Sequence, residues 1–117
     1  MRRDYQLISQ VFKALAHPVR LEIVDLLRQG EVCVCHIETA LGRRQAYVSQ
    51  QLTVLRDAGL VDSRKEGLQV YYRLTDERAA LLLEVLYGPS EHARREKLEG
   101  CPCPACATIM LSEIQGA

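Results

Sequence analysis

Residues 34–60, VCHIETALGRRQAYVSQQLTVLRDAGL, decide the fold because they contain two helical patterns separated by one glycine. Apolar residues recur at helical spacing from Val34 to Leu41, and Gly42 follows. A second helix is predicted from about residue 44 to residue 58, with Gly59 after it. Its inward-facing residues are Val48, Leu52 and Leu55. Two helices joined by a short turn that contains glycine form the helix-turn-helix pattern.

Two further helices are predicted on the N-terminal side of this pair. Apolar residues at helical spacing between Leu7 and Leu15 predict a first helix. It should stop near His17, because Pro18 disfavours helical geometry in the residue before it. Pro18 then begins the next helix, and Gly30 is placed to end that helix as a left-handed cap.

On the C-terminal side the pattern changes to strands. Residues 60–65 and 69–74 flank Glu66-Gly67-Leu68 and predict a β-hairpin, or wing, whose tip carries the basic residues Arg64 and Lys65. A last helix, capped by Thr75 or Asp76, should run to Gly88. It is more apolar than the surface helix of a monomer needs to be, so we assign it, with the first helix, to a dimer interface. The predicted fold class is mainly α with a small β-hairpin, a dimeric winged helix-turn-helix.

Composition sets limits on the class of protein. A chain of 117 residues with 48% hydrophobic residues suits one domain, which we place at residues 1–88, followed by a cysteine-containing tail at residues 89–117. The net charge of zero argues against a protein coated with basic residues, yet bases outnumber acids between Arg43 and Arg73. Neither a secretion signal nor a membrane span is evident, which predicts a cytoplasmic protein without a membrane partner.

The second helix of the pair has the residues of a DNA-reading helix. Polar residues at its N-terminal end can donate or accept hydrogen bonds at base edges in the major groove. They are Arg43, Arg44, Gln45, Tyr47, Ser49 and Gln50. The alternative is that they form only the solvated side of a surface helix, but the preceding helix, the wing and the local positive charge favour binding to double-stranded DNA. Arg64 and Lys65 in the wing are expected to meet phosphates or a minor groove.

The chain resembles the ArsR/SmtB family of winged helix-turn-helix metal-responsive repressors. Four separated segments carry the resemblance, which covers roughly residues 7–86. They are FKALAHPVRL at 12–21, EVCVC at 31–35, VSQQL at 48–52, and RKEG at 64–67 with VYY at 70–72. The resemblance implies a homodimer that sits on an operator and is released by an inducer. Arg44 stands where family members often have a capping serine, and the tail after Gly88 lies outside the shared pattern.

Cys33 and Cys35 are the candidate sensor, and the resemblance implies arsenic- or cadmium-type sensing at this position. Residues two apart on a helix point about 200° from one another, so two thiolates converge on one ion only if the first turn unwinds or if the ion lies at the very end of the helix. Binding would then distort this helix. A helix N-terminus favours thiolate, the form that binds soft ions. The alternative is that each cysteine is a small buried hydrophobic residue.

The third ligand differs from the family pattern. Members that bind trivalent arsenic within this helix have another cysteine where this chain has Glu38, and a carboxylate is a poor substitute for a thiolate on arsenic. Cys101, Cys103 or Cys106 of the tail could supply the missing sulfur to arsenite or antimonite, with cadmium, lead or zinc as alternative ions. The tail could instead form a separate zinc site with His92 or a partner's thiol, or serve only redox chemistry.

Three other functions have less support in the sequence. Zinc sensing through the last helix is disfavoured, because Arg78 occupies the position of a zinc-binding histidine and Pro89 interrupts the other end. A thiol-redox or persulfide-responsive repressor would use the same cysteines without a metal. An enzyme is not indicated, since no catalytic spacing, phosphate loop or site for a small organic substrate is evident.

Overall fold

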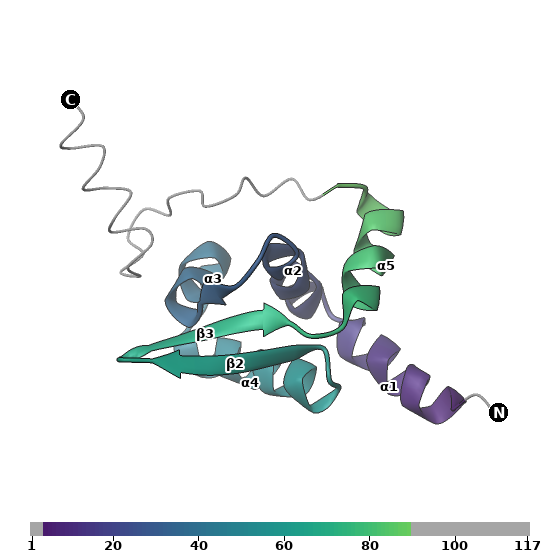
Figure 1. Ribbon diagram of the computed structural model, residues 1–117, viewed down its shortest axis with the longest axis horizontal. Helices are drawn as coiled ribbons and strands as arrows, with labels where there is room; N and C mark the ends of the chain where they lie inside the picture. The colour runs from purple at the N-terminus through teal and green to yellow at the C-terminus, as the bar shows by residue number, and fades with distance from the viewer. Residues whose placement is uncertain (1–3, 90–117) are drawn as a thin grey trace.

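The computed structural model describes residues 4–89 of the chain (Figure 1). The described helices are α1 (Tyr5–Leu15), α2 (Pro18–Leu27), α3 (Val34–Leu41), α4 (Gln45–Asp57) and α5 (Glu77–Tyr87). The described strands are β1 (Val32–Cys33), β2 (Val61–Glu66) and β3 (Gln69–Leu74). The predicted class is confirmed: mainly helical, with α3 and α4 as the helix-turn-helix pair and β2–β3 as the wing. The wing turn and the N-terminal end of α1 lie at opposite ends of the molecule (Figure 1).

The junction of α1 and α2 follows the prediction from Pro18. The Nδ1 atom of His17 accepts a hydrogen bond from the backbone N–H of Val19 at 3.1 Å, so His17 caps α2. Arg20 fixes the junction to α4: its Nε donates to the Ala14 carbonyl at 2.6 Å and its Nη1 to Oε1 of the buried Gln51 at 2.9 Å. The first two helices are thereby held against the helix expected to read DNA.

The predicted end of α2 is wrong. The helix stops at Leu27, Arg28 caps it in right-handed helical geometry, and Gly30 has a φ of 137°, outside the left-handed helical region. The side chain of Arg28 is held by Asp25 at 2.5 Å and by the Gly88 carbonyl at 3.0 Å. The chain then passes through an extended segment into β1.

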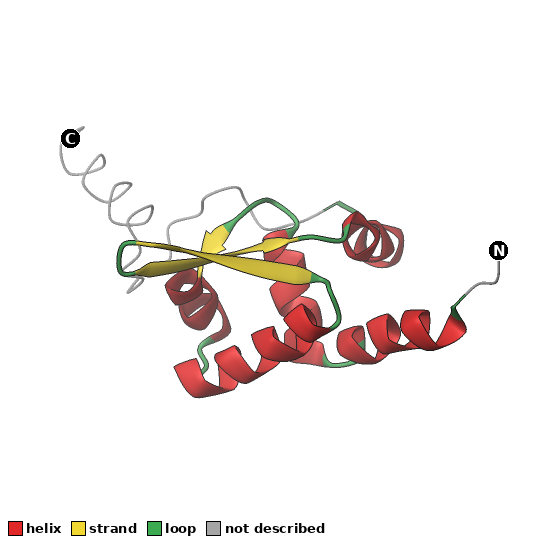
Figure 2. Ribbon diagram, turned by 60° about the horizontal axis from the view of Figure 1, so that its bottom comes forward, coloured by secondary structure: helices red, strands yellow, loops and turns green. Residues whose placement is uncertain are grey.

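The sheet contains one strand more than the hairpin predicted from the sequence. β2 and β3 pair antiparallel around a two-residue turn whose first residue, Gly67, has a φ of 60°. β1 then pairs antiparallel with the other edge of β3, giving the order β1-β3-β2. Figure 2 shows the sheet edge-on, with α3 and α4 on one side of it. The extra strand attaches the segment before α3 directly to the wing.

The core lies where the helical spacing predicts. Val48, Leu52 and Leu55 of α4 are at most 1% exposed and pack in one apolar cluster with residues of α2, α3 and α5. Gly42 ends α3, as predicted, and is a left-handed cap with a φ of 61°; Gly59 follows α4 at a φ of 77°. Among residues 4–89, no helix has both the length and the apolar character needed to cross a bilayer.

Candidate nucleic-acid interface and thiol site

The exposed side of α4 carries three of the six predicted reading residues, and Arg43 and Arg44 precede the helix. The helix begins at Gln45, with Arg44 as its N-cap in extended geometry and without a side-chain capping hydrogen bond. Gln45, Ser49 and Gln50 are exposed, while Val48 on the opposite side is buried. At about 100° per residue, the exposed side also includes Ala46 and Thr53, which were not singled out from the sequence. These residues present small and polar groups to a potential groove.

Tyr47 lies off this exposed side. Its side chain is half-buried and packs against the apolar core. The guanidinium carbon of Arg43 lies 5.4 Å from the centre of the Tyr47 ring, within the range of a cation–π contact. Tyr47 therefore supports Arg43 at the helix entrance.

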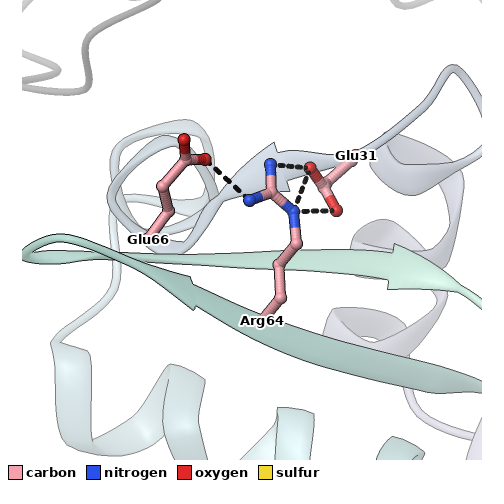
Figure 3. Close-up of polar contacts among 3 residues, drawn as sticks. All are labelled: Glu31, Arg64 and Glu66. Atoms are coloured by element: carbon pink, nitrogen blue, oxygen red, sulfur yellow. Dashed lines mark hydrogen bonds and ion pairs between the residues drawn. The ribbon is translucent and has the colours of Figure 1, made fainter.

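The two basic residues of the wing have different surroundings. Arg64 donates from Nε to both carboxylate oxygens of Glu31 at 2.9 and 3.0 Å, and its Nη2 lies 2.6 Å from Oε1 of the same residue (Figure 3). Its Nη1 donates to Glu66 at 2.6 Å, and its guanidinium covers the Tyr71 ring at 4.7 Å. Lys65 is exposed. Arg64 is thus held by two carboxylates, whereas Lys65 is not in an ion pair within the described residues; the contact of both with DNA stays a prediction.

The thiols of Cys33 and Cys35 converge on one atom. Sγ of Cys33 donates to Oε1 of Gln69 at 3.0 Å, and Sγ of Cys35 donates to the same oxygen at 3.8 Å. Cys33 is 3% exposed and Cys35 is half-buried, and neither is in a disulfide. Thiol sulfurs are the donors that a soft ion prefers. The residues present therefore fit such an ion at this point.

This convergence arises because Cys33 is not part of the helix. It is the N-cap of α3, with φ −67° and ψ 145°, and its backbone pairs with Tyr71 in the sheet. Only Cys35 has helical geometry, so the angle of about 200° expected for two helical residues does not apply. The sequence prediction placed both cysteines in the helix; the structure corrects this for Cys33, which lies in β1 and caps α3.

Glu38 gives no third ligand in this arrangement. Its Oε1 is buried and has no hydrogen-bond partner among the described residues. Within residues 4–89, no three His, Cys, Asp or Glu side chains are grouped as a metal site. The described part of the chain therefore provides two sulfurs. Cys101, Cys103, Cys106 and His92 lie outside the described residues.

Gln69 and Glu31 are site residues that the sequence did not reveal. Gln69 is the first residue of β3 and contacts both thiols, although it is more than thirty residues away in the chain. Glu31 precedes β1 and binds the wing through Arg64. Neither type of contact has a periodic sequence signal, because each joins segments that only the folded sheet brings together.

The comparisons with known proteins agree with this geometry. Residues 17–63 match the family described as bacterial regulatory protein, arsR family. The biofilm growth-associated repressor of Agrobacterium fabrum is 49% identical over 80 residues, which are 68% of each chain. The chain belongs to the ArsR family. Its relatives are transcriptional regulators, a class of proteins that are not enzymes.

Two more relatives of this ArsR-family chain bear on its function. The arsenical resistance operon repressor of Escherichia coli is 44% identical over 84 residues, covering 71% of this chain and 72% of that protein. The homodimeric winged helix-turn-helix DNA-binding domain of a possible ArsR-family regulator from Mycobacterium bovis superposes with a TM-score of 0.64 at 30% identity. It covers 96% of this chain and 85% of that one.

The ion pair between Glu31 and Arg64 predicts a pH-dependent contribution to stability. The hydrogen bond from Arg64 holds the pKa of the Glu31 carboxyl below its usual value. A lowered folded-state pKa stabilises the fold above the unfolded-state pKa, and this contribution is lost as the pH falls through the folded-state pKa. We expect Glu31→Gln to lower the free energy of unfolding at neutral pH and to converge with the wild type in acid. Denaturant unfolding across pH measures this.

Glu22→Gln is the matched control, because Glu22 is exposed on α2 and no ion pair of the described residues includes it. It should keep the wild-type pH profile. Salt should also reduce the difference caused by Glu31→Gln, since exposed charges are screened. A Glu31→Gln difference that is constant with pH would contradict the assignment.

Proposed function

We propose that this chain is a homodimeric transcriptional repressor that leaves its operator DNA when a thiophilic metal(loid) ion binds Cys33 and Cys35. Arsenite or antimonite is the proposed inducer. The observation that carries the proposal is the convergence of both thiols on one oxygen at the start of α3. This helix precedes α4, whose exposed polar side is the proposed reading surface. A cytoplasmic, reducing compartment would keep the thiols available.

Exposed apolar side chains support a homodimer formed through α1 and α5. These two helices lie at the same end of the molecule in both ribbon views (Figures 1 and 2). Their large exposed apolar residues are Tyr5, Leu7, Ile8 and Phe12 on α1 and Leu81, Val85, Leu86 and Tyr87 on α5. Large exposed apolar residues gathered on two helices at one end of the molecule are typical of an interface. A two-fold dimer would present two α4 helices to half-sites about one DNA turn apart.

Different residues of the proposed reading surface would contribute to affinity for DNA and to preference for particular bases. Gln45, Ser49 and Gln50 have side chains suited to base edges, and Arg43 and Arg44 are suited to bases or phosphates at the helix entrance. Lys65 at the wing supplies a positive charge that no acidic residue of the described chain neutralises. Zero net charge is compatible with this arrangement, because the charge that matters is local.

Ion binding and DNA binding would oppose each other through residues near α3. Val34 and Leu41 of α3 pack against the same core as Val48 and Leu52 of α4, so a displacement of α3 moves the reading helix. A coupling of about 1–3 kcal/mol between the two ligands is enough for induction. Because the thiols already converge, this displacement needs a change of angle rather than unwinding of the first turn.

The tail is proposed to complete the site. Arsenic(III) is most stable with three soft ligands, and the described residues offer two sulfurs. Arg28 binds the Gly88 carbonyl, which anchors the beginning of the tail near the end of α2, shortly before Cys33 in the chain. Residues 89–100 could span on the order of 40 Å when extended, so a tail thiol of the same or the partner subunit can reach the pair.

A redox response is the second candidate, supported by the same convergence. Thiols that share one acceptor can be joined by an oxidant, with loss of two electrons and two protons. Cadmium or lead, which accept two thiolates with other ligands, are further alternatives to arsenic. Retention of stoichiometric ion after desalting separates an ion sensor from a redox sensor.

The reading surface predicts two kinds of effect on operator binding. Gln45→Ala should weaken binding and relax base preference, because it removes a contact to a base edge. Tyr47→Phe should do the same if the hydroxyl contacts DNA, and it keeps the packing that Tyr47→Ala would lose. Lys65→Ala should lower affinity for all sequences and reduce the salt slope by about one unit. Binding titrations at several salt concentrations measure both; unchanged binding in all three variants would exclude this surface.

The thiols predict a separation of DNA binding from induction. Cys33→Ser and Cys35→Ser should each bind operator, because a hydroxyl can still donate to Gln69. Neither should be released by arsenite, antimonite or cadmium, because a hydroxyl is a poor ligand for soft ions. Anisotropy of labelled operator during ion titration measures release. Normal release of both variants by every soft ion and oxidant would make this site structural.

Truncation before Gly100 tests the role of the tail. DNA binding should persist, while the concentration of arsenite needed for release should rise by an order of magnitude or more, since one sulfur ligand is lost. A full-length chain with Cys101, Cys103 and Cys106 all changed to serine is the control for tail length. Equal sensitivity of the truncated and full chains would assign these cysteines to another function.

A further inference from the structure

The wing is joined to residues 31–35, which we call the sensor segment, by three kinds of contact. The β1 backbone pairs with β3, Glu31 binds Arg64 (Figure 3), and both thiols donate to Gln69. The backbone pairing and the ion pair do not involve sulfur. Only the third contact must change chemically when the sulfurs acquire a new bond.

Gln69 lies in the wing directly after its turn and contacts both thiols. It is the first residue of β3, it pairs with Glu66 across the hairpin, and the turn Gly67–Leu68 directly precedes it. Leu68 is 96% exposed. The carboxamide of Gln69 therefore connects the solvent-facing end of the wing with the beginning of α3.

The hydrogen bonds to Gln69 depend on the chemical state of the sulfurs. A carboxamide oxygen only accepts hydrogen bonds, and a neutral thiol can donate one. A cysteine that binds a soft ion does so as a thiolate and releases its proton, and a cysteine in a disulfide has no hydrogen on sulfur. In both states Oε1 of Gln69 would face sulfur lone pairs. The carboxamide must then turn its Nε2 to the sulfurs or move away with its strand.

We propose that Gln69 is the positioning residue that transmits the state of the two thiols to the wing. With free thiols it holds the turn end of the wing against the start of α3, and with occupied or oxidised thiols it releases or reorients that end. The inducer then lowers operator affinity through the wing as well as through α4. This inference rests on the proposed function, because it requires that Cys33 and Cys35 bind the inducer.

Gln69→Leu tests the inference in the full-length dimer. Leucine has a similar size but no acceptor. Operator affinity is measured with and without arsenite, and again with and without cadmium, while ion stoichiometry is measured separately after desalting. We expect the variant to bind the ion with wild-type stoichiometry. The ratio of its operator affinities without and with ion should be smaller than the wild-type ratio by roughly fivefold or more, because the coupling contact is absent.

Two controls separate coupling from loss of structure. Leu68→Ala changes the neighbouring exposed residue and should keep the wild-type ion response. Gln69→Val, which favours a strand, is the second variant if leucine prevents folding. In backbone amide spectra, Gly67 and Leu68 should shift when the wild type binds ion and should stay in place in either Gln69 variant.

The outcomes distinguish the two proposals. A wild-type chain that binds no soft ion, or that keeps its operator when it does, overturns the proposed function and this inference with it. A wild type that is released, together with Gln69 variants released over the same range and with the same amide shifts, overturns only the role of Gln69.

Discussion

The passage from strand to helix between Cys33 and Val34 is the constraint on which the thiol site depends. Cys33 has extended geometry and pairs with β3, and Val34 is already helical, so no loop separates β1 from α3. The side chain of Cys33 is therefore fixed to the sheet and that of Cys35 to the helix. An ion bound by both sulfurs would therefore constrain the angle between the wing and the helix-turn-helix pair.

The basic residues of the protein fall into two groups, those held in ion pairs and those without an acidic partner among the described residues. Arg64 forms ion pairs with Glu31 and Glu66, and the pair with Glu31 joins the wing to the segment before β1. Among residues 4–89, no acidic side chain pairs with Arg43, Arg44 or Lys65, which remain available for an anionic partner. A chain with zero net charge can thus present a positive surface, because acids are placed where the basic residues have structural roles.

The sequence predicted well those parts of the fold that have a local signal. Helical spacing and Pro18 located α1, α2 and α4 to within about two residues at most ends, and the residues around Gly67 located the hairpin. β1 was missed because two residues have no periodicity. Gly30 was misassigned because α2 ends at Leu27 with Arg28 as its cap, so that Gly30 lies beyond the cap. The thiol geometry could not be predicted, since it depends on β1 and on Gln69, which the sheet brings from a distant part of the chain. The individual DNA contacts and the tail ligands stay predictions.

Glu38 suggests how the choice of ion is decided. Cys35 and Glu38 are three residues apart and thus neighbours on one side of α3, and Oε1 of Glu38 is buried without a hydrogen-bond partner. Such an oxygen typically costs about 1–3 kcal/mol, and more when it is charged. A carboxylate suits divalent ions such as zinc or cadmium better than arsenic(III), which needs a third sulfur. The described residues form no three-ligand group. Under the proposed function, a tail thiol that completed the pair would favour arsenic(III), and Glu38 would favour a divalent cation.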